Sequence, residues 1–258
     1  MGSECIEPRA HSDLHSVLMG PVLLVRCDAF ETFGVAPAAI AEAGARAHVW
    51  DALGGETAPA LEEVGGIVVF GSTSNVEDAP SQPFIGRVGA IVREAVDRSV
   101  PVLGVCFGAQ VLAWTLGAAI RRASAREVGF EPIRPTREAS DDRLLSHYGD
   151  GDQVFQWHMD TFDLPEGATL LASGDRVAHQ AFRVGAITWG VQFHLEIDAG
   201  ELEQWLDAFA EEGDLLAEWG KTADQVRHEA SRYLNEHERR GAEVFRRFAA
   251  VVRDPAPV

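Results

Sequence analysis

Residues 101–110 read Pro-Val-Leu-Gly-Val-Cys-Phe-Gly-Ala-Gln. Val100–Val105 is apolar and rich in β-branched residues, which is typical of a strand buried on both faces of a sheet. Phe107–Leu116 follows at once with the composition of an apolar helix. A buried strand that passes directly into a helix through Gly-x-Cys-x-Gly has the pattern of a nucleophile elbow in which cysteine replaces serine.

Cys106 stands at the centre of this turn, with Gly104 and Gly108 two residues to either side. Such a turn is strained, and side chains two residues from the nucleophile would collide, so glycine is favoured at both positions. The turn lifts the sulfur out of the sheet to a helix N-terminus, where the helix dipole and free N–H groups favour the thiolate. Cys106 is therefore a candidate nucleophile. The alternative is a buried structural cysteine in a glycine-containing turn.

The chain on both sides of this turn has the pattern of an α/β protein. From Pro21 onward, short apolar runs alternate with amphipathic stretches, which indicates β-α-β units on a mainly parallel sheet. The expected strands are Val22–Val25, Ala47–Trp50, Gly66–Phe70 and Ile187–Phe193, and the expected helices are Ala36–Ala43 and Phe84–Arg98. Residues 118–186 hold shorter strand-like pieces between charged loops: Gly129–Ile133, Gln153–Trp157, Thr169–Ala172 and Val177–Phe182.

Three parts are expected along the chain: a lead-in over residues 1–16, an α/β domain over residues 17–198, and a C-terminal helical extension over residues 199–258 packed on that domain. The lead-in lacks the basic and then apolar plan of a signal peptide. In the extension, apolar residues recur at helical spacing from Leu202, and a second helix is expected at about Ala223–Val252. Its apolar stripe is expected to pack on the sheet, with a partner protein as the alternative.

The composition excludes some classes of function. A formal net charge of −18 and an isoelectric point near 4.8 argue against a nucleic-acid surface, because phosphate binding needs clustered Lys and Arg. No apolar run approaches the ~20 residues of a membrane-spanning helix. Cys5, Cys27 and Cys106 cannot all pair, and their spacings fit no zinc site. We therefore expect reduced thiols, a cytoplasmic location, no metal, no cofactor, and no contact with nucleic acid or a membrane.

A second segment supplies the groups that a thiolate nucleophile needs. Residues 189–196 read Trp-Gly-Val-Gln-Phe-His-Leu-Glu and end an expected apolar strand. Residues two apart in an extended strand point the same way, so His194 and Glu196 are expected side by side. His194 would act as the base for Cys106. Glu196 would accept a hydrogen bond from the imidazole, which fixes its tautomer and stabilises the imidazolium.

The stretches Gly-Val-Cys-Phe-Gly-Ala-Gln and Gln-Phe-His-Leu-Glu together resemble the motifs of the class I glutamine amidotransferases, GxCxGxQ and FHPE or FHxE. The separation of Cys106 and His194 along the chain also fits that family. The chain is most similar to the stand-alone GMP synthase-like amidotransferases, with which it shares Glu127–Phe130, Gln156–Phe162, Pro165 and Gln180–Arg183.

The resemblance implies both a fold and a set of site residues. The fold is a mainly parallel central sheet flanked by helices, a flavodoxin-like three-layer sandwich, here with a C-terminal helical extension. Cys106, His194 and Glu196 would be the nucleophile, the base and the orienting acid. The oxyanion hole would use backbone N–H groups of Gly71, Ser72 and Phe107, and the positions that hold the substrate glutamine are matched by Gln110, Trp157 and His158.

The loop after the third expected strand departs from the family pattern. The family usually has Gly-Gly-Pro there, whereas this chain has Gly71-Ser72-Thr73. Because this loop is small and polar and lacks the rigid turn, we expect it to be loosely held, so that a docked partner would complete the oxyanion hole. Met159 also replaces a glycine after His158, which alters the approach of substrate at that point.

The function that the resemblance implies is hydrolysis of the glutamine side chain through a cysteine thioester, with release of ammonia. The chain has neither an SGGxDS signature nor a P-loop, so an ammonia-accepting synthetase would be a separate protein. Two alternatives stay open. One is a γ-glutamyl hydrolase that acts on γ-glutamyl conjugates with the same triad. The other is a catalytically silent binding or regulatory module, which the altered oxyanion loop allows.

Overall fold

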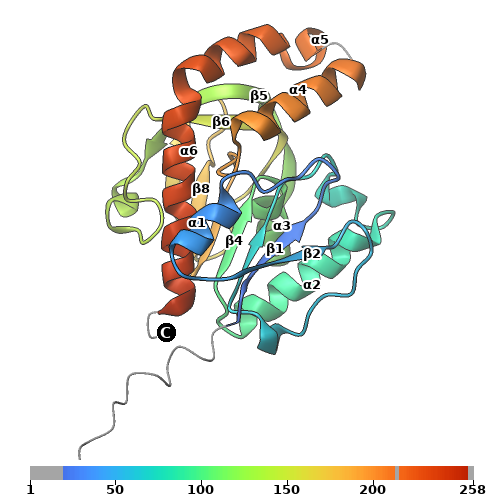
Figure 1. The fold of residues 1–258 in the computed structure, drawn as a ribbon, viewed down its shortest axis with the longest axis vertical. Coiled ribbons are helices and arrows are strands. Elements are labelled where there is room, and N and C mark those ends of the chain that lie inside the picture. Colours follow the sequence, from blue (N-terminus) through green and yellow to red (C-terminus); the bar gives the residue numbers. More distant parts are fainter. Residues whose placement is uncertain (1–19, 213–214, 255–258) are drawn as a thin grey trace, which may run out of the picture.

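The computed structural model describes residues 20–212 and 215–254, so the expected lead-in at residues 1–16 lies outside the described part. Within it, nine strands form one sheet in the order β2-β1-β3-β4-β9-β8-β7-β5-β6 (Figure 1). One half of the sheet is parallel and consists of β2 (Ala47–Asp51), β1 (Val22–Arg26), β3 (Gly66–Val69), β4 (Val102–Val105) and β9 (Thr188–Val191). The other half is antiparallel and consists of β8 (Ala181–Val184), β7 (Thr169–Gly174), β5 (Ile120–Pro135) and β6 (Gln153–Phe162).

Helices cover both faces of the parallel half. One face carries α1 (Ala36–Glu42) and α6 (Ala223–Arg253), and the other carries α2 (Pro83–Asp97) and α3 (Phe107–Thr115). Alternate residues of β1 divide between the two cores: Val22 and Leu24 pack in the core of α1 and α6, and Leu23 and Val25 in that of α2 and α3. Because both faces are covered, β1, β3 and β4 are nearly continuous apolar runs. The expected three-layer sandwich with a mainly parallel centre is confirmed.

The strands of the antiparallel half differ from those expected. β5 runs over Ile120–Pro135 instead of Gly129–Ile133, because its charged first part pairs with β6 from Ile120 opposite Phe162 to a bulge after Arg122. The expected strand Val177–Phe182 begins only at Ala181. Exposed, charged residues in the first part of β5 hid its strand character, since only the half-buried positions of a strand carry an apolar signal.

The C-terminal helices are α4 (Ala199–Glu212), α5 (Leu215–Trp219) and α6. Thr222 begins α6 with a capping box, in which its hydroxyl accepts the N–H of Gln225 at 3.2 Å and the Gln225 side chain accepts the N–H of Thr222 at 2.8 Å. The apolar stripe of α6 is buried against the sheet and α1: Val244, Phe245, Phe248, Val251 and Val252. Figure 1 shows α6 running alongside α1, so the stripe packs within this chain. We propose that the boundary between the α/β domain and the C-terminal helical extension lies between residues 198 and 199.

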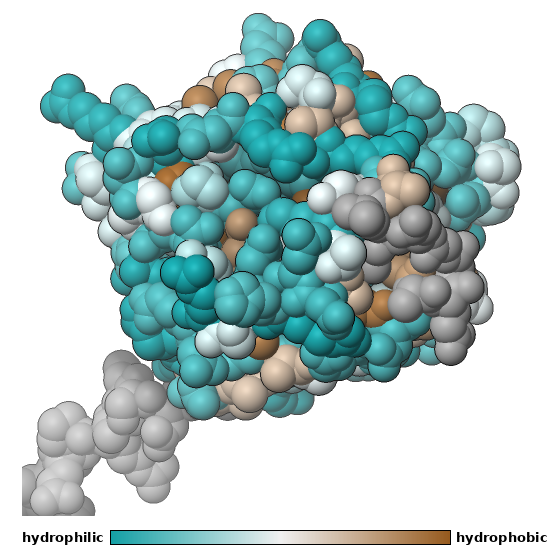
Figure 2. Space-filling view, turned by 90° about the horizontal axis from the view of Figure 1, so that it is seen from above, coloured by the Kyte–Doolittle hydropathy of each residue, from teal (hydrophilic) through white to brown (hydrophobic). Residues whose placement is uncertain are grey.

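The outer surface agrees with the acidic composition. Figure 2 shows a mostly hydrophilic face with scattered hydrophobic residues. The exposed large apolar side chains of the described residues are Val49, Leu53 and Trp114. Among the described helices, none combines the length and the apolar character that a membrane crossing requires.

Candidate active site

The turn at Cys106 has the geometry of a nucleophile elbow. Cys106 has a φ of 51° and a ψ of −109°, which is a strained backbone for a residue with a side chain. A Cβ on Gly104 would lie 2.5 Å from the carbonyl oxygen of Gly108, and a Cβ on Gly108 would lie 2.1 Å from that of Val69. Both glycines are therefore needed because the turn folds back against its own backbone and against β3.

The Cys106 thiol lies at the N-terminus of α3 and is 5% exposed. Its Sγ is 3.8 Å from the carbonyl oxygen of Trp157 on β6. The side-chain amide of Gln192 also points to the sulfur, with Nε2 3.8 Å from Sγ. Gln192 is fully buried, and its oxygen accepts a 3.4 Å hydrogen bond from Gln110. Sequence reasoning missed Gln192, although it stands two residues before His194 in the motif, and residues two apart share a direction.

His194 is held on several sides. Its Nδ1 bonds to Oε1 of Glu196 at 2.7 Å, and its main chain bridges to Phe155 of β6, with its N–H donating to the Phe155 carbonyl at 2.9 Å. The Trp205 ring packs edge-on against the imidazole with centroids 4.8 Å apart. β9 ends at Val191, so the expected strand Ile187–Phe193 was too long. His194 and Glu196 therefore lie beyond the regular strand, and their side chains meet in the hydrogen bond from Nδ1 to Oε1.

The charge state of the imidazole follows from its neighbours. Burial alone lowers the pKa of His194, but the negative charges of Cys106 and Glu196 outweigh burial and hold that pKa well above its ordinary value. Since Nδ1 is bound to Glu196, Nε2 is the remaining nitrogen, and it has no hydrogen-bond partner among the described residues. The arrangement therefore leaves one imidazole nitrogen for exchange of a proton inside the pocket that Cys106 lines.

A second histidine, His237, holds the main chain of His194 through a hydrogen bond. His237 of α6 is fully buried, and burial lowers its pKa to about 4, so the ring is neutral at physiological pH. Its Nε2 donates a hydrogen bond to the carbonyl oxygen of His194 at 2.7 Å. The C-terminal helix thus positions the main chain that carries the imidazole.

The loop Gly71-Ser72-Thr73 is fastened by side chains, contrary to our expectation of a loosely held loop. The Ser72 hydroxyl donates to the carbonyl of Cys27 at 2.8 Å. The backbone N–H and the hydroxyl of Thr73 both donate to Oδ2 of Asp28 at 2.8 Å. The expectation considered only apolar packing and the missing proline, whereas hydroxyl groups supply the constraint here. The backbone N–H groups of Gly71 and Ser72 have no acceptor among the described residues.

Phe107, the third expected oxyanion donor, is the first residue of α3. Its backbone N–H has no acceptor among the described residues, as expected for the first turn of a helix. Phe107, Gly71 and Ser72 all line the pocket that contains Cys106 and His194. The structure thus brings the expected oxyanion residues to the same cavity as Cys106 and His194 of the expected triad.

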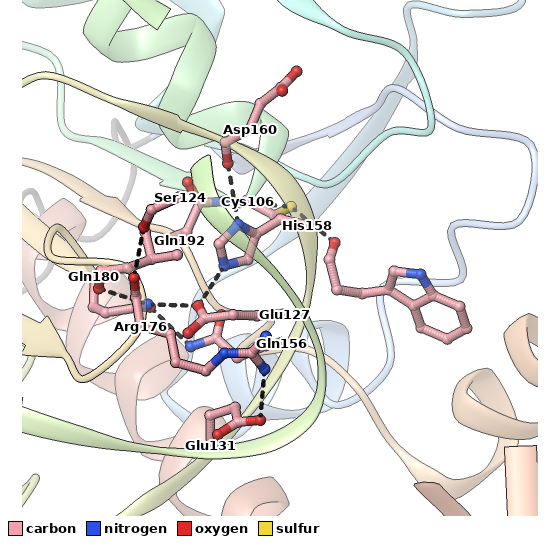
Figure 3. Close-up of polar contacts among 12 residues, drawn as sticks. Cys106, Ser124, Glu127, Glu131, Gln156, His158, Asp160, Arg176, Gln180 and Gln192 are labelled. Carbon is pink, nitrogen blue, oxygen red and sulfur yellow. Dashed lines mark hydrogen bonds and ion pairs between the residues drawn. The ribbon is translucent and has the colours of Figure 1, made fainter. Parts of the chain in front are cut away.

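His158 belongs to a buried polar network next to the elbow (Figure 3). Its Nε2 lies 2.9 Å from Oε2 of Glu127, and its Nδ1 lies 3.1 Å from the carbonyl oxygen of Asp160. Gln180 donates to the same Glu127 oxygen at 3.0 Å and accepts from Gln156 at 2.8 Å. Both ring nitrogens of His158 are already bound, so the side chain holds β6 in place instead of offering a free nitrogen to the pocket.

Gln110 and Trp157 border the same space. Gln110 donates to the carbonyl oxygen of Asp160 at 3.0 Å and is 4% exposed. Trp157 packs its ring against Phe209 of α4, with centroids 4.5 Å apart, and against Trp205 at 6.0 Å. All three expected substrate-binding residues, Gln110, Trp157 and His158, therefore line the pocket.

The pocket lies at the carboxyl ends of β1, β3 and β4, where ligands bind in open α/β sheets. The volume of the pocket, including the part open to solvent, is about 820 Å³. Loop residues and the elbow form its floor, and aromatic side chains of β6 and of the C-terminal helices form one wall: Trp157, Trp205, Phe209 and Trp219. Within residues 20–212 and 215–254, no group of three or more His, Cys, Asp or Glu side chains is arranged to hold a metal ion.

Comparison with known proteins agrees with this geometry. Residues 38–211 match the model of the family Glutamine amidotransferase class-I. The chain is 36% identical over 139 residues to GMP synthase [glutamine-hydrolyzing] of Porphyromonas gingivalis, which covers 53% of this chain and 26% of that protein. It is 28% identical over 148 residues to the glutamine amidotransferase-like protein YfeJ of Salmonella typhimurium, covering 56% and 62%.

Solved structures give the same result over more of the chain. A glutamine amidotransferase from Thermotoga maritima superposes with a TM-score of 0.79 at 25% identity, covering 92% of this chain and 99% of that one. A glutamine amidotransferase from Methylobacillus flagellatus shares the fold, with a TM-score of 0.81 at 24% identity over 89% and 94%. The fold, the pocket and the family match define one class of protein, a glutamine amidotransferase domain. The chain belongs to the class I glutamine amidotransferase family.

Proposed function

We propose that the protein hydrolyses the side-chain amide of glutamine to glutamate and ammonia, with Cys106 as nucleophile, His194 as base and Glu196 as orienting acid. The observation that carries the proposal is the buried His194–Glu196 pair at 2.7 Å, whose free Nε2 opens on the pocket of a strained, helix-capping cysteine. A strained nucleophile and a base held by a third group are the parts that acyl transfer needs.

The reaction proceeds in two halves. Cys106 gives its thiol proton to His194 Nε2 and Sγ attacks the carboxamide carbon, so that the C–S bond forms as the carbonyl oxygen takes the negative charge. The tetrahedral intermediate collapses with cleavage of the C–N bond, and His194 Nε2 gives its proton to the departing nitrogen, which leaves as ammonia. Water then gives a proton to His194 Nε2, and the resulting hydroxide attacks the carbonyl carbon of the thioester. Glutamate leaves and the thiolate returns.

The oxyanion is bound by backbone N–H groups of Ser72, Gly71 and Phe107, which have no protein acceptor among the described residues. Such donors stabilise a charge that exists only in the intermediate, each by about 3–4 kcal/mol. Gln110 and the main chain at Trp157 and His158 contact the glutamine. For His158 the backbone is the contact, because both of its ring nitrogens are bound.

The ammonia passes to a separate acceptor synthetase in this proposal. Two facts support it: the curated relatives include GMP synthase [glutamine-hydrolyzing], and the match spans 26% of the Porphyromonas gingivalis protein of that name. A cytoplasmic location is part of the proposal, supported by the unpaired thiols of Cys27 and Cys106.

A second candidate function is hydrolysis of γ-glutamyl conjugates whose leaving amine is larger than ammonia. The observation that favours it is the aromatic wall beside Cys106, formed by Trp157, Trp205, Phe209 and Trp219. Such a wall gives an apolar group of the leaving amine a surface to bind.

One assay separates the two functions and tests both. Ammonia and glutamate are measured with glutamine as substrate, and an aromatic amine is measured with a γ-glutamyl anilide. We expect turnover of glutamine by the wild type and none by Cys106→Ala, with Cys27→Ala as the matched control that keeps activity. A kcat/KM much higher for the anilide than for glutamine would favour the second function, and turnover by Cys106→Ala would reject the triad for both.

A further inference from the structure

Three buried carboxyl groups lie around the loop that contacts Glu196, and the reaction above uses only one of them. Glu196 binds the imidazole, whereas Glu31 and Glu201 bind the neighbouring N–H groups of Phe33 and Thr32. Glu196 is fully buried, Glu31 is 3% exposed and Glu201 is 1% exposed. In each residue the oxygen Oε1 has a hydrogen-bond partner. In each residue the oxygen Oε2 is buried and has no partner among the described residues. Three orphaned carboxyl oxygens in one place need an explanation, because a buried polar atom without a partner is costly.

Glu31 and Glu201 hold the same loop from opposite ends of the chain. The loop, residues 27–35, connects β1 to α1 and is called here the β1–α1 loop. Glu31 accepts the backbone N–H two residues further along at 2.6 Å. Glu201, in the first turn of α4, accepts the N–H of Thr32 at 2.8 Å. Gly34 of the same loop lies close to Glu196 and Glu201. A Cβ at this position would lie 1.9 Å from the carbonyl oxygen of Glu196 and 3.0 Å from Oε2 of Glu201.

The three groups cannot all be ionised together. Among the described residues, no lysine or arginine forms an ion pair with Glu31, Glu196 or Glu201; their only salt-bridge partner is the imidazole that binds Glu196. Arg26 of β1 lies instead over the Phe33 ring, 5.1 Å from its centroid. Buried like charges without a cation partner disfavour one another's ionised form, so we expect at least one carboxyl to keep its proton.

Glu196 is the carboxylate paired with His194, whose pKa its negative charge raises. The proton therefore belongs to the other two. We propose that Glu31 and Glu201 share one proton, and that this pair is a positioning device that holds the β1–α1 loop and α4 against Glu196. A proton on one of the two carboxyl groups turns its Oε2 from an orphaned acceptor into a donor to the other, which gives both orphaned oxygens a partner.

The direction of the pKa shifts agrees with this arrangement. Burial, followed by the negative charges of Glu196 and Glu201, raises the pKa of Glu31 well above its ordinary value. Burial, with the charge of Glu196, raises the pKa of Glu201 to about 7, opposed by the hydrogen bond from Thr32. The other titratable groups that face the pair are His194, after β9, and Cys27, at the end of β1.

The pair acts on the site through the same loop. At one end of the β1–α1 loop, Asp28 binds Thr73 of the oxyanion loop; at the other end, the N–H of Val35 donates to the carbonyl oxygen of Glu196 at 2.9 Å. The shared proton therefore joins α4, the orienting acid and the oxyanion loop into one unit. The inference rests on the proposed function only for what the unit does in catalysis; the existence of the shared proton does not depend on it.

The first experiment looks for the proton without any substrate. Protein with isotope-labelled glutamate is measured at pH 7 by infrared spectroscopy, in which a protonated carboxyl group absorbs apart from a carboxylate. We expect one protonated-carboxyl band in the wild type, its loss in Glu31→Gln/Glu201→Gln, and its persistence in Glu203→Gln, an exposed glutamate of the same helix. Absence of the band from the wild type, or its persistence in the double variant, would overturn the proposal.

The second experiment measures positioning. Glu201→Gln keeps the shape and a neutral donor, so its kcat for glutamine should stay within about threefold of wild type, whereas Glu201→Ala should lose about tenfold or more in kcat with a smaller change in KM. The dependence of kcat on pH above neutrality should flatten in Glu201→Gln, because no second charge can form there. If glutamine is not turned over, the pH dependence of Cys106 alkylation replaces kcat. Equal effects of Gln and Ala, in variants with wild-type circular dichroism, would show a merely structural role.

Discussion

Gly71 and His194 are so close that no side chain fits between them. A Cβ on Gly71 would lie 2.9 Å from Cε1 of the imidazole and 3.5 Å from its Nδ1. The backbone of Gly71 is not left-handed, so the requirement for glycine is one of space and not of conformation. The loop expected to bind the oxyanion and the ring expected to move the proton are therefore in direct contact, and a change in either displaces the other.

We expect Gly71→Ala to lower kcat by about 10- to 100-fold, because displacement of a reacting group by about 1 Å costs that much. Circular dichroism should remain that of the wild type, since the clash is with a single side chain at the pocket. Gly86→Ala in α2 is the matched control: a Cβ there meets nothing within 4 Å, and we expect a small gain in stability with no change in kcat. Wild-type kcat in Gly71→Ala would show that the imidazole works from another position.

Gln192 is expected to favour the thiolate of Cys106, because its side-chain N–H points to the sulfur at 3.8 Å. In Gln192→Leu, alkylation of Cys106 by iodoacetamide at neutral pH should slow by about tenfold, which is the effect of one hydrogen bond to a charged group. Gln192→Glu should slow it further, since a carboxylate opposes a second negative charge. The reaction is followed by mass spectrometry on the intact protein.

The control for this prediction is Gln204→Leu, a change at an exposed position of α4 that should leave alkylation unaffected. Cys27 should react slowly in every variant, because burial and the negative charge of Glu31 raise its pKa well above the ordinary value. Preferential labelling of Cys27, or equal rates in Gln192→Leu and wild type, would contradict the assignment of Gln192.

His237 makes the fold sensitive to acid. Its pKa is about 4 in the folded protein, against about 6.5 for an unperturbed histidine, so between these values the unfolded chain binds the extra proton. Stability from this residue is present above pH ~6.5 and is lost as pH falls to ~4, by about 3 kcal/mol. Urea unfolding across this pH range should show that the free energy of unfolding falls less with pH in His237→Gln than in wild type. The exposed His228→Gln should follow wild type. Equal slopes in all three would place the acid sensitivity elsewhere.

The sequence predicted those parts of the site that depend on local geometry. The glycines around Cys106 follow from the local geometry of one turn, and the His-x-Glu spacing predicted the pair of His194 and Glu196. The structure places Cys106 and His194 in one pocket, with Glu196 bonded to the imidazole. The fastening of the Ser72–Thr73 loop could not be predicted, because its acceptors at Cys27 and Asp28 lie on a different strand end.

The carboxyl pair of Glu31 and Glu201 was missed for a related reason. Sequence patterns report burial for apolar residues, and a glutamate in a loop or in the first turn of a helix is ordinarily solvent-exposed. Only the fold brings Glu31 and Glu201 to neighbouring N–H groups of the β1–α1 loop, which also contacts Glu196. The same limit applies to the network of Glu127, His158 and Gln180, whose members come from three different strands or loops.

Asp28 is expected to determine how fast the isolated chain hydrolyses glutamine. It receives both the N–H and the hydroxyl of Thr73 at 2.8 Å, so it keeps the oxyanion loop assembled without a partner protein. The isolated wild type should therefore hydrolyse glutamine at a substantial rate. Asp28→Ala should lower kcat by about 10- to 100-fold with a smaller change in KM, because a displaced donor weakens binding of the transition state more than binding of glutamine.

Asp97→Ala, an exposed acid on α2, is the matched control. An acceptor synthetase that binds the loop would restore kcat in Asp28→Ala more than it raises kcat in wild type. If Asp28→Ala keeps wild-type kcat while the wild type is strongly activated by a partner, the loop is assembled by docking and not by Asp28.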